Sequence, residues 1–330
     1  ILETMDLSLK PLGNFSDSLQ GTMPSDRNRL VFCFWEIGTV DSEYIFMQGS
    51  SIGQKLYSGM YQIFKGELFK KIYKEIGGRY QGQKAWGKKG VAISIMSEMP
   101  TFVYTGEIYD GNIHAIVPIN ENDQKAIFVY SRSSQFKEEI RKIDQKVSVT
   151  CATISKIPFD IEYWQKIADE KYPNGLPKPY SDDPTQWLFH GNPIITEYPL
   201  QVALARLLNY NWPAESDAKM ELADEARELI AEIKAFDHLA DEDGIVCIPS
   251  VNGEQAAAER LRDYLIEVWG NQWSRQTINQ LLEKEGTRAS NLETWLRDEF
   301  FAQHCKLFGN RPFIWHIWDG RKDGFSALVN

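Results

Sequence analysis

The sequence predicts an α+β fold in which a mixed-sheet domain is followed by a mostly helical domain. Short apolar runs separated by turn residues fill the first half, which is typical of strands. From residue 194 onward, apolar residues recur at helical spacing. Five prolines fall within residues 172–193. We therefore place an α+β domain at residues 1–171, a proline-rich linker at 172–193 and a helical region at 194–330, which suits a chain of 330 residues.

The elements of the first half follow from its apolar runs. Residues 29–37 (RLVFCFWEI) predict a buried strand, and the glycine- and serine-rich residues 49–60 predict a loop. A short helix is expected at residues 65–76 and a longer one at 125–143. Further strand-like runs lie at residues 91–96, 101–105 and 113–117, and residues 147–157 alternate between apolar and polar side chains.

Capping residues predict where helices begin. Asp160 is the expected N-cap of a short helix before the linker, and Asp183-Pro184-Thr185-Gln186 has the form of a capping box. We expect Ser216 to cap an acidic helix through Phe236, and Ser290-Asn291-Leu292-Glu293 to open a helix through about Phe308. Other helices are expected at residues 197–210, 253–269 and 275–284, with short strands near 244–250 and 311–319.

The charge of the chain is divided unevenly. The net charge is −10, yet residues 1–160 hold 19 Lys and Arg against 18 Asp and Glu, whereas residues 161–330 hold 17 against 28. A near-neutral first half can still carry a local basic face. No apolar stretch has the length of a membrane helix, so we expect no membrane partner. Four widely separated cysteines predict reduced thiols and a cytoplasmic protein.

The strongest chemical signal is a cationic stretch at residues 54–90. It holds nine Lys and Arg against two Glu, with Tyr80 and Trp86 interleaved and five glycines between residues 77 and 90. Lysines contact phosphates regardless of sequence, whereas Arg and Gln can read guanine and adenine edges. A solvated lysine-rich surface is the simpler alternative. The candidate DNA-binding residues here are Lys74, Arg79, Gln81, Gln83, Lys84, Trp86, Lys88 and Lys89.

A second, weaker basic group follows on the predicted helix at 125–143. Lys137 and Arg141 are four residues apart and so share one helix face. Neighbouring acids at Glu138, Glu139 and Asp144 dilute the charge. The candidates in this group are Arg132, Lys137, Arg141 and Lys142.

The motifs of common enzymes are missing from the sequence. Five acid-x-lysine pairs are about what chance gives, so they do not support a nuclease. Asn192-Pro193 lacks the aromatic residue that a base-methylating N-P-P-Y motif uses, and no glycine-rich cofactor loop follows a strand. The five histidines are scattered. We therefore assign no catalytic and no metal-binding residue, and we favour core packing for the aromatic residues Phe313, Trp315, His316 and Trp318.

Several segments together resemble one family. They are GVAISIMSEMPTFVYTGEIYDGNIHAIVP at 90–118, the stretch from AIFVYSRSSQFKEEIRKIDQ to YSDDPTQWLFHGNP at 126–193, PLQVALARLLNYNWPAE at 199–215, DEDGIVCIPSVNGEQAAAERL at 241–261, and FFAQHCKLFGNRPFIWHIWDGRKDGFSALVN at 300–330. They look like the region after the catalytic domain in large adenine-specific DNA methyltransferases. These are the single-chain type II restriction–modification proteins and the related phage-defence (BREX-like) methylases.

The resemblance implies a target-recognition domain similar to that of type I specificity subunits, followed by a helical C-terminal region. It implies a bacterial cytoplasmic protein that binds double-stranded DNA and works with its own upstream methyltransferase domain and further defence-system subunits. S-adenosylmethionine would then be the cofactor of that upstream domain, with none in this chain, because the cofactor and catalytic motifs would precede Ile1. The alternatives are an interaction scaffold that docks partner subunits of a defence complex, and a self-contained nuclease.

Overall fold

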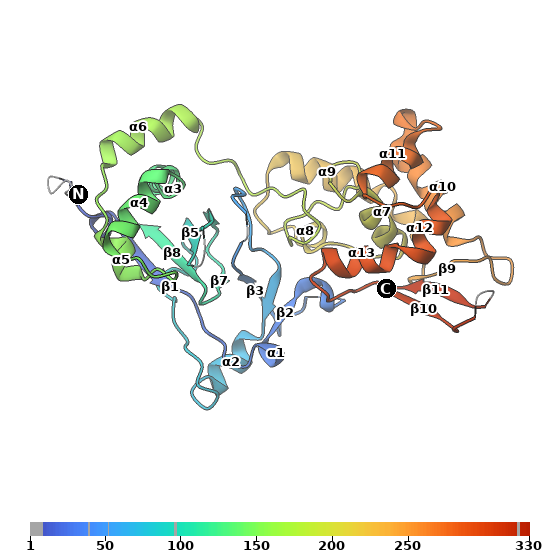
Figure 1. The fold of residues 1–330 in the computed structure, drawn as a ribbon, viewed down its shortest axis with the longest axis horizontal. Coiled ribbons are helices and arrows are strands. Elements are labelled where there is room, and N and C mark those ends of the chain that lie inside the picture. The colour runs from blue at the N-terminus through green and yellow to red at the C-terminus, as the bar shows by residue number, and fades with distance from the viewer. Residues whose placement is uncertain (1–8, 39, 52, 96–97, 322–323) are drawn as a thin grey trace. The chain divides into compact units, whose positions relative to one another are not determined.

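The computed structural model describes residues 9–38, 40–51, 53–95, 98–321 and 324–330. The chain divides into two compact units, Ile1–Pro177 and Lys178–Asn330, which we call unit 1 and unit 2 (Figure 1). The division falls inside the proline-rich residues 172–193. Both helices and strands are present, with mixed sheets, so the fold is α+β.

Unit 1 is built on two four-stranded sheets. The first is antiparallel, in the order β1 (Ser16–Gln20), β8 (Ile113–Pro118), β5 (Gly90–Ser94) and β6 (Thr101–Tyr104). The second is mixed, in the order β2 (Val31–Cys33), β4 (Gln62–Phe64), β3 (Ile45–Gln48) and β7 (Ile108–Tyr109), with β3 and β7 parallel. The strands expected at 101–105 and 113–117 are therefore confirmed, and the strand expected at 91–96 is confirmed as far as Ser94, with Met96 outside the described residues. The strand expected at 29–37 is confirmed only in its centre, between α1 (Arg27–Leu30) and the 3-10 turn Phe34–Glu36.

Helices cover the first sheet in two layers. α3 (Gln124–Ser131) packs on β5, β6 and β8, and α6 (Ile161–Lys171) packs on α3 from outside (Figure 1). Asp160 caps α6 as expected, because its Oδ1 accepts a hydrogen bond from the Tyr163 N–H at 3.0 Å. The remaining helices of unit 1 are α2 (Gly66–Ile72), α4 (Ser134–Ile143) and α5 (Cys151–Lys156).

Local capping changes two of the expected elements of unit 1. The helix expected at 125–143 is two helices, because Ser133 Oγ accepts from the Phe136 N–H at 3.1 Å and starts α4 anew. The alternating residues 147–157 contain the helix α5, which begins where Thr150 Oγ1 accepts from the Thr153 N–H at 3.2 Å.

Unit 2 is mostly helical and carries one small sheet. α7 (Pro199–Leu207) is buried along its whole length and packs against α10 (Ala257–Trp269) and α11 (Thr277–Lys284). The other helices are α8 (Pro213–Ser216), α9 (Asp224–Lys234), α12 (Leu292–Asp298) and α13 (Phe300–Leu307). The antiparallel sheet has the order β10 (Trp315–Trp318), β11 (Ser326–Val329) and β9 (Ile245–Cys247), so both short strands expected in this region are confirmed.

Two helix starts expected in unit 2 are wrong and one is confirmed with a shift. Asp183 Oδ1 accepts from the Thr185 N–H and hydroxyl, so it closes a turn and no helix follows. Ser216 is the last residue of α8, and the acidic helix begins only at Asp224. Asn291, one residue after Ser290, caps α12 through the Thr294 N–H at 2.8 Å, and Glu299 separates α12 from α13.

Candidate nucleic-acid interface

The cationic stretch contains α2 and the loop that follows it. α2 ends at Ile72 with Tyr73 as its C-cap, and the turn that follows it ends at Gly77, which has a φ of +68°. The Gly78 N–H donates to the Tyr73 carbonyl at 2.6 Å and closes this turn with the six-to-one hydrogen bond that a Schellman motif uses. A Cβ on Gly78 would lie 2.6 Å from the Phe69 ring. The glycines at this point therefore let the chain leave the helix while its backbone stays against the core.

A chain of aromatic contacts holds the loop. Ring centroids lie 5.8 Å apart for Phe69–Tyr73, 5.9 Å for Tyr73–Tyr80 and 5.3 Å for Tyr80–Trp86. Trp86 also packs against two hydrophobic clusters of unit 1, one formed by the first sheet and one by the second. Its indole Nε1 is buried without a hydrogen-bond partner among the described atoms. The partly buried ring therefore anchors the loop, and its contact with DNA stays a prediction.

The tip of the loop consists of two consecutive turns, which bury some of its side chains and expose others. Ala85 N–H donates to the Gly82 carbonyl at 2.9 Å, and Lys88 N–H donates to the Ala85 carbonyl at 3.0 Å. Ala85 is fully buried, whereas the side chains of Gln83, Lys84, Lys88 and Lys89 are exposed. The turns therefore present three lysines and one glutamine on the outer side of the loop.

Arg79 and Gln81 connect the loop to residues 21–23. The backbone of Arg79 pairs with Met23 in both directions, at 2.9 and 3.0 Å, and its side chain is exposed. Gln81 Nε2 donates to the Gly21 carbonyl at 2.9 Å. The backbone of Arg79 is thus fixed by hydrogen bonds while its side chain is exposed, whereas the side-chain amide of Gln81 is already hydrogen-bonded within the fold.

We use the name cationic face for the exposed basic side chains of α2 and its loop. Lys70 lies near Glu67, but both side chains are exposed, and such pairs contribute little to stability. Sequence reasoning did not single out Lys70 and Lys71 as candidates, although their exposure adds them to this surface. The members of the cationic face are Lys70, Lys71, Lys74, Arg79, Lys84, Lys88 and Lys89.

The second basic group is engaged within unit 1. Lys137 Nζ lies 3.1 Å from Glu98 Oε2, and Lys142 Nζ lies 2.9 Å from Glu139 Oε1. Arg141 donates to the backbone carbonyl of Lys146. Arg132 donates to the Gln54 carbonyl and lies over the Phe128 ring, with 5.2 Å to its centroid. These contacts leave the second group less able to contact phosphate than the cationic face.

Buried histidines do not form a reactive centre. Burial lowers the pKa of His114 and His190 to about 4 and that of His304 to about 3, so all three are neutral at pH 7. His304 Nε2 accepts from the Ile314 N–H at 3.2 Å, which is a structural contact. Within the described part of the chain, no group of three or more His, Cys, Asp and Glu side chains is arranged to hold a metal ion.

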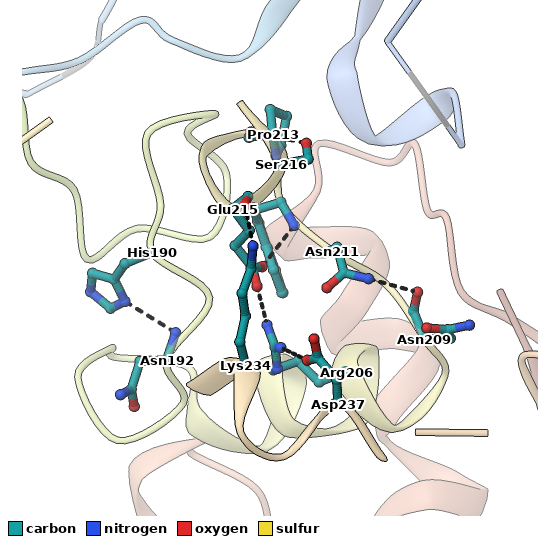
Figure 2. A network of polar contacts seen from close by, with 11 residues as sticks. His190, Asn192, Arg206, Asn209, Asn211, Pro213, Glu215, Ser216, Lys234 and Asp237 are labelled. Carbon is teal, nitrogen blue, oxygen red and sulfur yellow. Dashed lines mark hydrogen bonds and ion pairs between the residues drawn. The ribbon is translucent and has the colours of Figure 1, made fainter. Parts of the chain in front are cut away.

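Unit 2 contains a buried ion network, which Figure 2 shows. Arg206 Nη1 lies 2.7 Å from Glu215 Oε2, and Arg206 Nη2 lies 2.6 Å from Asp237 Oδ1. The other carboxylate oxygen of Glu215 accepts from the Trp212 N–H at 2.9 Å. Gly191 lies against this pair, since a Cβ there would be 2.4 Å from Glu215 Oε1. The network links α7, α8 and the turn after α9, and its Arg206–Glu215 pair is buried.

The prediction that the aromatic residues of 313–318 pack in the core is wrong for Trp315 and Trp318. Phe313 is buried, but Trp315 is 53% exposed and Trp318 is 62% exposed. β10 is the edge strand of its sheet, so its large side chains lie on both faces with only one neighbouring strand to pack against. The sequence did carry a sign of this arrangement: Trp315 and Trp318 are three residues apart, so in a strand they point to opposite faces of the sheet.

Comparisons with known proteins identify no family. No protein-family model matches the chain, and a search of curated proteins returns no match. Among the described residues, no helix has both the length and the apolar character needed to cross a membrane.

Proposed function

We propose that this chain is the sequence-specific DNA recognition part of an adenine-N6 DNA methyltransferase from a restriction–modification or phage-defence system. The observation that carries the proposal is the cationic face, which gathers seven exposed Lys and Arg on α2 and its loop in a protein of net charge −10. The sequence resemblance to target-recognition regions supports the choice of double-stranded DNA as the ligand. In this proposal an upstream methyltransferase domain binds S-adenosylmethionine and transfers the methyl group.

The outward side chains divide into two roles. Lys84, Lys88 and Lys89 contact backbone phosphates, because an ammonium is a point charge without base-edge specificity. Arg79 and Gln83 read base edges, because a guanidinium and an amide can each make paired hydrogen bonds to a base. Gln83 Nε2 donates to the Tyr80 carbonyl at 3.0 Å, which orients the amide, and the side chain of Gln83 is exposed whereas that of Gln81 is partly buried.

The first experiment is selection of a random duplex library on the purified chain at low and moderate salt, followed by sequencing of the retained DNA. Enrichment of a motif is the expected result. Retention without enrichment would reduce the role of the chain to phosphate contact. A failure to retain DNA even at low salt would reject the proposal.

Paired variants separate the two roles. Lys88→Ala with Lys89→Ala should weaken binding to all duplexes alike and flatten the salt dependence, because each lost phosphate contact removes about 0.9 from the slope of log K against log salt. Gln83→Ala should relax the preference at one base position and leave that slope unchanged. Lys156→Ala with Lys166→Ala, two exposed lysines on α5 and α6, is the matched control and should change neither property.

A further inference from the structure

The sheet of unit 2 has an apolar face and an open edge. Directly paired residues of antiparallel strands share a face, so Trp315, Val329 and Ile245 lie together, next to Ile317, Ala327 and Cys247. Trp315, Ile317 and Ile245 are 53%, 49% and 38% exposed, and Phe325, directly before β11, is 46% exposed. Exposed large apolar side chains that adjoin one another are a feature of interaction sites.

The open edge adds unpaired backbone groups. β10 pairs with β11 on one side, and none of the described strands pairs with its other side. The Asp319 N–H donates to the Phe325 carbonyl at 3.0 Å, and alternation along the antiparallel ladder then turns the N–H and C=O of His316 and Trp318 toward the open edge. A row of such groups is a template for an added strand.

A cavity of about 650 Å³ lies at the β9 end of this surface. Its apolar lining includes Ile245, Cys247 and Phe325. Its acidic lining comprises Asp241, Glu242, Asp243 and Glu254, with Arg260 as the single basic residue among those that line it. Arg260 is already paired with Asp241, so the other three exposed carboxylates give the cavity a negative potential.

We propose that the β9–β11 sheet binds an extended basic segment of a partner protein. The segment adds a strand to β10, places apolar side chains on Trp315 and Ile317, and inserts a Lys or Arg side chain into the acidic cavity. Charge complementarity favours this occupant over a neutral or acidic one, because the cavity is anionic and residues 178–330 hold 25 Asp and Glu against 15 Lys and Arg. The proposal does not depend on DNA binding by unit 1.

The test is selection of a phage-displayed library of random peptides on the full chain, followed by titration of a synthetic peptide from the enriched set. We expect enriched peptides to alternate apolar residues with Lys or Arg. Trp315→Thr with Ile317→Thr keeps strand-forming residues in β10 but removes both large apolar side chains from the proposed contact, and should weaken binding about tenfold or more. Glu242→Lys with Glu254→Lys should do the same through charge alone.

Matched variants and a modified peptide complete the test. Ile266→Thr removes an exposed isoleucine on α10, and Glu228→Lys with Glu232→Lys reverses two exposed acids on α9; both should bind the peptide as the original chain does. N-methylation of alternate backbone amides of the peptide should abolish binding if a strand is added.

Three results would overturn the proposal. The first is enrichment of acidic peptides. The second is equal binding of the selected peptide to the β10 variant and its control. The third is a concentration-dependent dimer in sedimentation that is lost in Trp315→Thr with Ile317→Thr, which would assign this edge to a second copy of the chain instead.

Discussion

At the scale of single residues, the least replaceable polar contact is the buried pair of Arg206 and Glu215. Their side chains are 4% and 1% exposed. A buried ion pair adds little net stability, but removal of one partner leaves the other charge buried and uncompensated. Asp237 touches the same guanidinium, yet its side chain is 50% exposed, so water can replace it.

We predict that Glu215→Ala lowers the free energy of unfolding by about 3–5 kcal/mol, because it strands the Arg206 charge. It also removes the acceptor of the Trp212 N–H. Asp237→Ala should cost about 1 kcal/mol or less, because its side chain is half exposed. Urea denaturation of both variants checks this. Equal losses for the two would mean that burial does not govern the network.

Glu285 gives a residue-scale prediction about pH. Its Oε1 accepts from the backbone N–H of Leu200 at 2.8 Å and of Gln201 at 3.3 Å, at the start of α7. Burial outweighs these hydrogen bonds and raises its pKa from 4.5 to about 7. Because the folded state disfavours the carboxylate, this group costs no stability below about pH 4.5 and lowers stability progressively as the pH rises to 7.

We predict that Glu285→Gln is more stable than the original chain at pH 8, by up to about 3 kcal/mol, since a shift of one pKa unit corresponds to about 1.4 kcal/mol. At pH 5 the two should differ little, because glutamine keeps the Oε1 acceptor and most of Glu285 is protonated. Thermal unfolding at both pH values measures the difference. A lower stability of Glu285→Gln at pH 8 would show that the hydrogen-bonded carboxylate is favoured after all.

At the scale of elements, local signals predicted those helix starts whose cap lies within the element itself. Asp160 accepts from an N–H three residues ahead, as its spacing predicted, whereas at α12 the cap is Asn291, one residue after the Ser290 that the spacing predicted. Ser216 failed because Trp212, Pro213 and Glu215 start α8 earlier and Glu215 is bound to Arg206. That preference comes from a tertiary contact that no local pattern displays.

The cationic loop shows the same limit for the candidate site. Counting charges located the cationic stretch, but it could not tell which of its side chains are exposed and which pack against the fold. Trp86 and Gln81 face the fold because the hydrophobic clusters of the two sheets and the carbonyl of Gly21 meet them, and these partners are brought there by other elements. Lys88, by contrast, is exposed, as its charge suggested.

We predict that Trp86→Ala costs about 2–3 kcal/mol of stability, less than a fully buried tryptophan because the ring is only partly buried. It should also weaken DNA binding, since the loop loses its anchor. Trp86→Phe should restore most of both properties, because it keeps the ring contact and loses no hydrogen bond. Urea denaturation and duplex titration check both. Weaker binding of Trp86→Ala at unchanged stability would instead indicate that the ring contacts DNA directly.

At the scale of the whole molecule, charge is separated between the two units. Residues 1–177 hold 21 Lys and Arg and 21 Asp and Glu, whereas residues 178–330 are strongly acidic. A polyanion is therefore repelled by unit 2 and drawn to the local excess of cations on α2 and its loop. Under the proposed function, the negative charge of unit 2 also limits unproductive binding, because DNA that reaches unit 2 is repelled.

The chemistry of the cationic face leads to our last prediction. Its members are Lys and Arg and include no histidine, and burial keeps His114, His190 and His304 neutral near pH 7. DNA affinity should therefore fall steeply with salt but have the same salt slope at pH 6 and pH 8. Fluorescence titrations of a labelled duplex over a salt series at both pH values measure this. A slope that decreases by about one between pH 6 and pH 8 would place a titrating group on a phosphate and contradict a face made only of lysines and arginines, because each phosphate contact accounts for about 0.9 of the slope.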